Sequence, residues 1–252
     1  MTTQTPTSPR EIVASGLCIG CGGCTTLEPA ATMGWDANGH LKPSAPKAWR
    51  RTETFAQICP FSPKAANEDE ISDGLFPEAP RDALIGRWAG AYVGHVAEGE
   101  YRMGGSSGGM VSWVAAELLR RGLIDGVAHV TPRSREQGDG RLFGYRISRS
   151  VEALSEGAKS RYYPVELSDV LREIEAVPGR YAVVGIPCFI KAVNLQRRTN
   201  PVIAERVTHT LGLFCGHMKS AKMVDSFAVQ LGTEPKQVAK VDYRLKDAGR
   251  PA

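Results

Sequence analysis

The stretch YAVVGIPC, residues 181–188, decides the architecture of the longer part of the chain. It is a short, continuous apolar run that ends in a Gly-x-Pro-Cys turn, as expected of a strand that is buried on both faces of a sheet. The residues that follow, FIKAVNLQRR at 189–198, have helical spacing. A buried strand that leads directly into a helix is typical of an α/β fold.

Strands and helices alternate in the same way on both sides of this stretch. Strands are predicted at 91–97, 125–131 and 206–216, and helices at 110–122, 168–179 and 219–232. We expect Gly122 to end the first of these helices and Ser168 to cap the second. The alternation predicts an α/β domain over residues 87–252 with a mainly parallel sheet.

Three cysteines lie close together near the N-terminus, in CIGCGGC at residues 18–24. Neighbours at this spacing cannot pair as disulfides without strain. Cys18, Cys21 and Cys24 have instead the C-x2-C-x2-C spacing by which ferredoxins bind a [4Fe-4S] cluster, and the glycines between them let the backbone wrap around it. The predicted fourth ligand is Cys59, because a proline follows it as in ferredoxins.

A structural zinc site and chance spacing are the alternatives for these cysteines. Zinc commonly uses two separated C-x2-C pairs, which a triplet does not match. We therefore expect a small ferredoxin-like [4Fe-4S] module at residues 11–63, after a disordered tail at 1–10 and before a polar, acidic linker at 64–86. The whole chain is then α/β, or α+β when this module is counted.

The composition limits the classes of partner. The chain has 252 residues and a formal net charge of +4, and its basic and acidic residues are interleaved, which argues against nucleic-acid binding. No apolar run approaches the roughly 20 residues of a membrane helix, and the polar N-terminus lacks the apolar core of a signal peptide. We therefore expect a cytoplasmic protein without membrane contact.

A glycine-rich turn, RMGGSSGG at residues 102–109, precedes the predicted helix at 110–122. Backbone N–H groups at the start of a helix bind anions, so the turn is a candidate phosphate site. It matches neither G-x-G-x-x-G nor a Walker loop. A tight turn capped by Ser106 or Ser107 explains the same pattern equally well.

Two further cysteines, Cys188 and Cys215, stand at the ends of consecutive predicted strands. Open α/β sheets bind ligands at the carboxyl ends of their strands, so both thiols are candidates for an active-site crevice. Isolated cysteines are as often small buried apolar residues. The pattern leaves both interpretations open.

Taken together, these motifs resemble the family formed by the beta subunits of coenzyme F420 hydrogenases and dehydrogenases. The resemblance runs in order through CIGCGGC, MGWDANGHLKPS, ICPF, GGSSGG, KSRYYP, GIPCF and GLFCGH. It implies an iron–sulfur flavoprotein with a [4Fe-4S] cluster on Cys18, Cys21, Cys24 and Cys59 and with FAD in the α/β domain. The candidate flavin-site residues are Ser107, Gly108, Gly109, Ser160, Arg161, Tyr162 and Cys188.

Two motifs depart from the family pattern. Arg161 stands where the family has lysine, and Ile186 and Phe189 flank Pro187-Cys188 where it has threonine and glutamine. A hydroxyl and an amide are therefore missing beside Cys188, which leaves the substrate open. Relatives also continue past the equivalent of the last residue, so the resemblance implies an incomplete flavin domain.

The expected function is electron transfer between the cluster, FAD and a two-electron partner such as coenzyme F420 or another organic molecule. A cluster moves single electrons, whereas a flavin exchanges both one and two electrons. One alternative is a non-catalytic electron-transfer subunit that docks on a partner dehydrogenase or exchanges electrons with a ferredoxin. The other is a zinc-stabilised interaction module.

Overall fold

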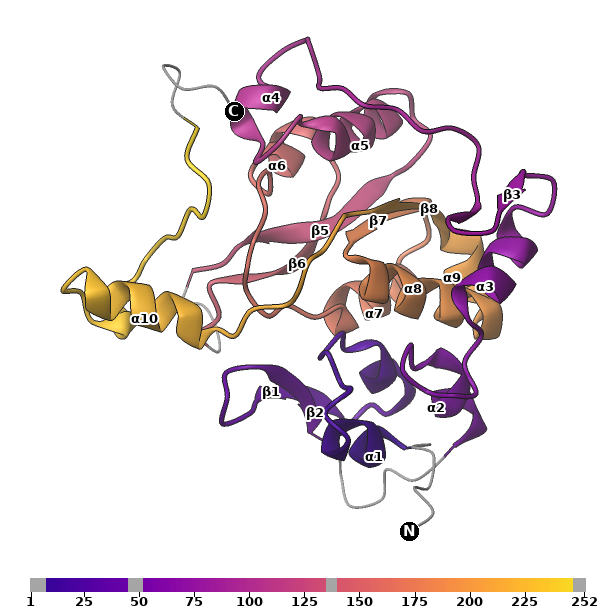
Figure 1. Cartoon of the computed structure of the whole chain (residues 1–252), viewed down its shortest axis with the longest axis horizontal. Helices are drawn as coiled ribbons and strands as arrows, with labels where there is room; N and C mark the ends of the chain where they lie inside the picture. Colours follow the sequence, from indigo (N-terminus) through magenta and orange to yellow (C-terminus); the bar gives the residue numbers. More distant parts are fainter. Residues whose placement is uncertain (1–7, 45–51, 135–139, 247–252) are drawn as a thin grey trace.

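A four-stranded mixed sheet forms the centre of the computed structural model, which describes residues 8–44, 52–134 and 140–246 (Figure 1). In spatial order the strands are β6 (Phe143–Ser148), β5 (Gly126–Pro132), β7 (Tyr181–Gly185) and β8 (Val207–Gly212). β5, β7 and β8 run parallel, and β6 pairs antiparallel with β5 at one edge. The predicted α/β fold is confirmed, and the sheet is mixed because of β6, a strand that the sequence analysis did not predict.

Helices cover both faces of this sheet (Figure 1). One face carries α5 (Met110–Arg120) and α6 (Val151–Ser155), and the other carries α7 (Ser168–Ala176), α8 (Pro187–Thr199) and α9 (Pro201–Arg206). Ala182 belongs to the apolar core under α5, whereas its neighbour Val183 belongs to the core under α7 and α8. Successive residues of a strand face opposite sides, so one continuous apolar run fills both cores.

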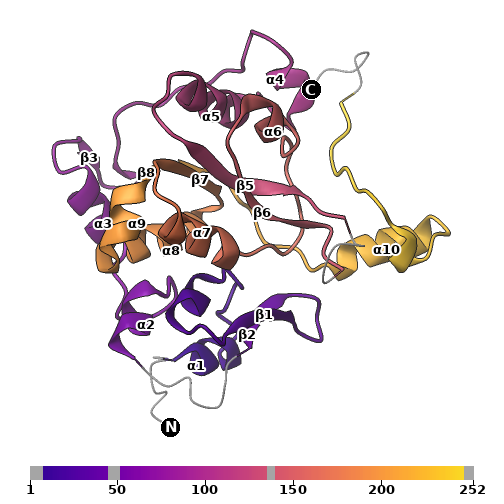
Figure 2. The same ribbon diagram turned by 180° about the vertical axis from the view of Figure 1, so that it is seen from behind.

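A short N-terminal unit packs against the helices on the second face (Figure 2). Its elements are α1 (Pro9–Ala14), η1 (Gly23–Leu27), β1 (Thr32–Trp35), β2 (Leu41–Ser44) and α2 (Glu53–Ile58). The Leu167 backbone N–H donates to the Cys21 carbonyl at 2.9 Å, and Gln196 Nε2 donates to the Gly23 carbonyl at 2.8 Å. The cysteine-rich loop is therefore joined directly to α7 and α8.

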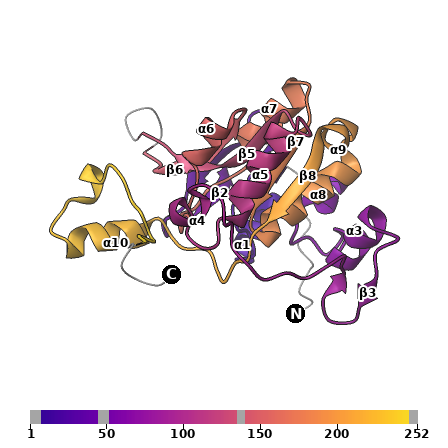
Figure 3. The ribbon, with the colours of Figure 1, turned by 90° about the horizontal axis from the view of Figure 1, so that it is seen from above.

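The hairpin of β1 and β2 also reaches the C-terminal part of the chain. The Asp36 carboxylate accepts the N–H groups of Asn38 and His40 and so shapes the hairpin turn. The carbonyl of Gly39 in this turn accepts the Ala221 N–H at 2.9 Å. Ala221 directly precedes α10 (Lys222–Gln230), which lies with η3 (Pro235–Gln237) beyond the β6 edge of the sheet (Figure 3).

The segment predicted to be a linker contains regular structure. It holds α3 (Glu68–Leu75), whose capping box joins Asn67 and Glu70, and a small hairpin of β3 (Arg81–Asp82) and β4 (Gly86–Arg87). Arg87 Nε donates to the Asp73 carboxylate at 2.6 Å and ties this hairpin to α3. Lys191 of α8 pairs with Glu68 at 3.0 Å, so α3 is also attached to the α/β domain.

Other local predictions differ from the structure. The strand predicted at 91–97 is wrong: this segment pairs with no strand among the described residues, and Tyr92 and Val93 are 94% and 106% exposed. Ser168 is the first residue of α7 and not its cap, because the neighbouring Glu166 carboxylate accepts its N–H at 2.6 Å. The turn predicted at 102–109 begins inside a short helix, α4 (Tyr101–Gly104).

The N-terminal end of the described chain is not a simple tail. Residues 1–7 of the predicted tail lie outside the described residues, but Ser8 caps α1 by accepting the Glu11 N–H.

None of the helices in the described ranges has the length and apolar character that a membrane-spanning helix needs.

Candidate functional site

The thiols of Cys18, Cys21, Cys24 and Cys59 line one pocket in the N-terminal unit. Cys18 and Cys21 lie in the loop that precedes η1, Cys24 lies in η1 itself, and Cys59 is the C-cap residue of α2. The Thr52 side chain caps the start of α2, and the buried Phe55 and Ile58 pack this helix against the pocket. This packing of α2 brings Cys59 to the triplet in spite of their separation in sequence.

The backbone around the thiols is arranged for close packing. Gly20 and Gly22 have φ of +72° and +79°, and a Cβ on Gly20 would lie 2.2 Å from the Leu41 carbonyl oxygen. The N–H of Gly20 hydrogen-bonds to the Cys18 sulfur, and that of Gly23 to the Cys21 sulfur. N–H groups directed at ligand sulfurs are a feature of iron–sulfur sites.

Burial dominates the acid–base behaviour of these thiols. It raises the pKa of Cys18, Cys21 and Cys24, and it raises the pKa of Cys59 to about 11. The neighbouring thiols Cys59 and Cys18 raise the pKa of Cys21 further, because thiolates repel one another. A metal that bound here would therefore displace thiol protons.

The donor set matches the chemistry of an iron–sulfur cluster, since four thiols surround a pocket that is otherwise mostly apolar. In the part of the chain that the structure describes, no group of three or more His, Cys, Asp or Glu side chains is arranged to hold a single metal ion.

Two lysines flank the thiol pocket. Lys42 Nζ donates to the Cys18 carbonyl oxygen. Lys191, whose side chain is 17% exposed, pairs with Glu68, and its charge lowers the pKa of Cys59. Positive charges at these positions would offset part of the negative charge that four thiolates bring to one site.

A buried ion pair supports the cysteine loop from the domain side. Arg141 Nη1 lies 3.2 Å from Glu166 Oε1, and both residues are 8% exposed. Arg141 Nη2 also donates to the Met33 carbonyl at 2.7 Å, and a Cβ on Gly22 would lie 2.5 Å from Glu166 Oε2. The sequence analysis missed this pair, since nothing in the local sequence around either residue indicates the partner.

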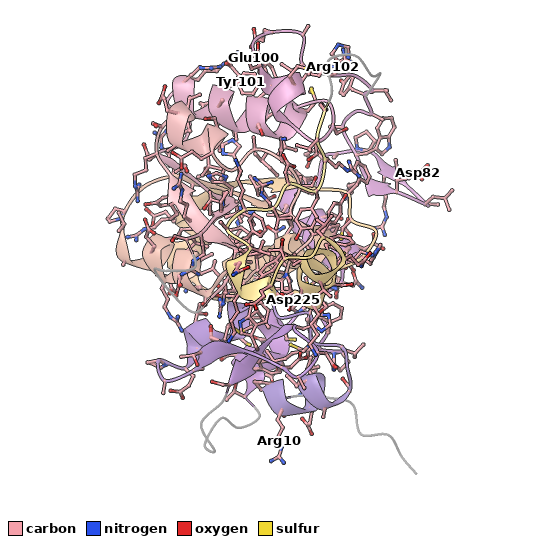
Figure 4. All side chains as sticks on the ribbon, turned by 90° about the vertical axis from the view of Figure 1, so that its left-hand side faces the viewer. Arg10, Asp82, Glu100, Tyr101, Arg102 and Asp225 are labelled. Atoms are coloured by element: carbon pink, nitrogen blue, oxygen red, sulfur yellow. The ribbon has the colours of Figure 1, made fainter. Side chains whose placement is uncertain are left out.

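The candidate flavin segments come together at the other end of the molecule. The Ser160 N–H donates to Ser106 Oγ at 2.8 Å. The serine–glycine turn (104–109) and the Ser-Arg-Tyr segment (160–162) are therefore neighbours. Figure 4 shows Tyr101 and Arg102 of α4, just before this turn, at the end opposite to Arg10 of α1. The sheet thus lies between the turn and the thiol pocket (Figure 1).

The glycines of this turn pack against the protein's own backbone. Gly109 has φ of +79° at the start of α5, and the Gly108 carbonyl accepts the Val96 N–H at 2.9 Å. A Cβ on Gly108 would lie 2.9 Å from the Gly94 carbonyl oxygen. Lys246 Nζ donates to the Ser107 carbonyl at 2.6 Å and brings a positive charge to the turn.

The remaining candidate residues have other contacts. The Arg161 guanidinium stacks 5.1 Å from the centre of the Phe143 ring, and Tyr162 packs edge-on against Tyr243 at 5.4 Å. The Arg161 Nη2 donates to the Ala158 carbonyl at 3.0 Å. Of the Ser-Arg-Tyr segment, Ser160 is therefore the residue that a hydrogen bond joins to the turn.

Cys188 and Cys215 lie near each other at the carboxyl edge of the sheet. The Leu213 N–H donates to the Gly185 carbonyl at 2.9 Å and holds the segments after β7 and β8 together. Cys215 is exposed, and its charge contributes to the raised pKa of Cys188, for which burial is the main cause. Cys188 also contributes to the raised pKa of Cys21, so it lies near the cysteine loop as well.

Comparison with known proteins identifies the family. Residues 91–172 match the family model for the N-terminal part of the coenzyme F420 hydrogenase/dehydrogenase beta subunit, and residues 179–250 match the model for its C-terminal part. The chain belongs to this family of coenzyme F420 hydrogenase and dehydrogenase beta subunits, and the resemblance found in the sequence is confirmed.

Two curated relatives match most of the chain. It is 24% identical over 251 residues to a coenzyme F420-dependent sulfite reductase of Methanocaldococcus jannaschii, covering 93% of this chain and 36% of that protein. It is 21% identical over 211 residues to a subunit of the F(420)H(2) dehydrogenase of Methanosarcina mazei, covering 83% of this chain and 56% of that protein. The chain thus spans only part of the length of either relative.

A chain of the F420-reducing [NiFe] hydrogenase complex from Methanosarcina barkeri is a structural neighbour. The TM-score is 0.49 at 21% identity, and the similarity covers 61% of this chain and 55% of that chain.

The buried ion pair leads to a prediction about stability. Replacing Glu166 with alanine is expected to lower the free energy of unfolding by about 3–5 kcal/mol, because the buried Arg141 charge then loses its carboxylate. Urea unfolding of the full chain under anaerobic conditions measures the loss. Glu156→Ala is the matched control, since its ion pair with Arg146 at 2.7 Å is exposed and should contribute little. Equal losses in the two variants would show that the buried pair does not support the loop.

Proposed function

We propose that the chain is an iron–sulfur flavoprotein oxidoreductase subunit, in which a [4Fe-4S] cluster on Cys18, Cys21, Cys24 and Cys59 exchanges electrons with FAD. The observation that carries this proposal is the single pocket lined by all four thiols. Membership of an F420-linked oxidoreductase family supports the same role. The two-electron partner is coenzyme F420 or another organic redox molecule.

The bound cofactors would supply the redox chemistry, with the cluster handling single electrons and the flavin accepting or releasing a pair. The protein's own residues prepare the cluster site. The four thiolates bind iron, and the N–H groups of Gly20 and Gly23 stabilise negative charge on the sulfurs. Ile12, Phe55 and Ile58 line the pocket and limit the access of water.

The serine–glycine turn is the proposed site of the flavin phosphates. It leads into α5, so the first N–H groups of an 11-residue helix and its dipole favour an anion there. Ser106, Ser160 and the Lys246 ammonium lie around the same turn. The carboxyl edge of the sheet near Cys188 is the proposed place of the flavin ring, because open α/β sheets bind ligands at this edge and Cys188 lies near the cysteine loop.

A non-catalytic role on a partner protein is the second candidate. Large apolar side chains are exposed on loops, among them Tyr92, Val93 and Phe214, and a partner protein would cover such surface. The Methanosarcina mazei relative is itself named as a subunit of a dehydrogenase. In this case, electrons pass from the cluster to a dehydrogenase subunit or to a ferredoxin without FAD on this chain.

Metal, sulfide and flavin analysis of the anaerobically purified chain tests the proposal. We expect iron and acid-labile sulfide in the ratio of a [4Fe-4S] cluster together with stoichiometric FAD. Cys21→Ser is expected to lose the cluster iron and its absorbance, whereas Cys215→Ser, which changes an exposed thiol, should retain both. Iron and sulfide without FAD would favour the second candidate. Zinc without sulfide would refute the redox role and favour a zinc-stabilised module.

The flavin site is tested by removing a hydroxyl from the turn. Ser106→Ala is expected to weaken FAD binding by about fivefold. The variant loses the acceptor of the Ser160 N–H, and this hydrogen bond holds the serine–glycine turn in place. Fluorescence titration of apoprotein with FAD measures the change, and Ser155→Ala, whose hydroxyl bonds within its own helix, is the control. Gly108 is a poor test residue, because any Cβ there meets the Gly94 carbonyl. Unchanged affinity in Ser106→Ala would place the flavin phosphates elsewhere.

The lysine beside Cys59 predicts a shift in reduction potential. Lys191→Gln removes a positive charge near the cluster site and is expected to lower the cluster potential by roughly 50 mV. A redox titration followed by electron paramagnetic resonance measures the potential. Lys240→Gln removes an exposed charge in the C-terminal segment and should leave the potential unchanged. The same potential in all three proteins would contradict the proposed position of the cluster.

A further inference from the structure

A second cavity, of about 190 Å³, lies between α8, α3 and α9. Its walls include Ile71 and Gly74 of α3 and Ala204 of α9, and its polar groups come from Asn194, Arg197 and Arg198 of α8. None of these residues lines the thiol pocket. The cavity is therefore separate from the site proposed above.

The Arg197 guanidinium is the main polar group of this cavity. Its Nη1 donates to Asn194 Oδ1 at 3.0 Å, and its buried Nε has no hydrogen-bond partner among the described residues. Burial lowers the pKa of Arg197, and no acidic group acts against that shift. The positive charge at this wall is thus partly desolvated, and no carboxylate of the described ranges forms an ion pair with it.

The acidic side chains of α3, the helix that faces the arginines, are all engaged elsewhere. Glu68 pairs with Lys191 at 3.0 Å, and Asp69 pairs with Arg81 at 3.0 Å. Glu70 accepts the Asn67 N–H, and Asp73 pairs with Arg87 at 2.6 Å. α3 offers Arg198 only a neutral group, the Glu70 carbonyl, at 3.3 Å. Among the described residues, the acids of α3 therefore form no ion pair with Arg197 or Arg198.

We propose that the cavity binds a small oxyanion, either free or as the phosphate or carboxylate group of a small molecule. A guanidinium presents a planar set of donors that matches such oxygens, and charge-assisted hydrogen bonds of this kind are stronger than neutral ones. Water could satisfy the free Nε–H, but water would not neutralise the partly desolvated charge of Arg197. A bound oxyanion would accept the Nε–H and would also neutralise the positive charge.

The position of the cavity gives the oxyanion a structural consequence. α3 contributes one wall and α8 the other, so an anion held by Arg197 and Arg198 of α8 lies between the two helices. α8 also carries Gln196, which holds the Gly23 carbonyl of the cysteine loop, and Lys191, which acts on Cys59. Occupation of the cavity therefore stabilises the helix on which the thiol pocket rests.

Thermal unfolding of the full chain tests this proposal with inorganic phosphate as the probe. The protein is unfolded in potassium phosphate and in potassium chloride at equal ionic strength and pH, and a third sample contains potassium acetate. Phosphate is expected to raise Tm by about 2 °C or more over chloride, because a ligand that binds the folded state alone stabilises it by mass action. A comparable rise in acetate would show that a carboxylate group suffices, and a rise in phosphate alone would assign the site to phosphate groups.

Variants separate a bound anion from a general salt effect, since phosphate also strengthens apolar burial in any protein. Arg197→Gln is expected to abolish the extra Tm rise, and isothermal titration should show phosphate binding at least about tenfold weaker. Arg198→Gln, which changes the more exposed arginine, should weaken binding in the same direction and remains informative if the first variant does not fold. Lys236→Gln removes an exposed positive charge of η3 and should keep the full response.

Two results would overturn the proposal. One is an equal Tm in phosphate, acetate and chloride for the unaltered chain. The other is a phosphate response in Arg197→Gln and Arg198→Gln that equals the response in Lys236→Gln, which would assign the stabilisation to the salt and not to the cavity. Iron and flavin content, measured in the same samples, keeps this outcome distinct from a failure of the cluster proposal.

Discussion

The docking of the cysteine loop onto α7 and α8 is the contact on which the arrangement of the chain depends. The carbonyls of Cys21 and Gly23 accept hydrogen bonds from Leu167 and Gln196, which belong to the α/β domain. Since these carbonyls point toward the domain, the nearby N–H groups of Gly20 and Gly23 remain available for the sulfurs. The buried pair of Arg141 and Glu166 completes the contact, so the N-terminal unit and the domain form a shared interior.

In this interior, groups that are costly to bury when charged lie next to the groups that stabilise their charge. A buried ion pair, or a buried thiol that loses its proton, disfavours folding unless the charge finds a partner. Arg141 has the Glu166 carboxylate and the Met33 carbonyl, whereas the thiols have N–H groups and the flanking ammonium groups of Lys42 and Lys191. The charges around the thiol pocket are thus consistent with a site that becomes negative when it is loaded, which is how a thiolate-bound cluster would differ from the protonated thiols.

The sheet relates the two ends of the molecule. The N-terminal unit with the thiols lies on the face of the sheet that α7 and α8 cover, and the serine–glycine turn lies on the face that α5 covers (Figures 1 and 2). Tyr145, which donates to the Val184 carbonyl at 2.8 Å and stacks on Phe189, fills the interior close to Cys21 and Cys188. Cys188, at the carboxyl end of β7, is therefore near both Tyr145 and the cysteine loop.

The sequence by itself determined the class of fold and the family, and it singled out the cysteines and the glycine-rich turn as candidate site residues. Continuous apolar runs such as 181–185 and helical periodicity such as 110–120 depend on local contacts and can be recognised locally. The tertiary structure alone decided that β6 reverses on β5, that residues 91–97 form no strand and that Glu166 replaces Ser168 as the acceptor at the start of α7. It also brought Cys59 to the triplet and Arg141 to Glu166, because such encounters depend on the packing of whole helices and strands and leave no periodic signal in the chain.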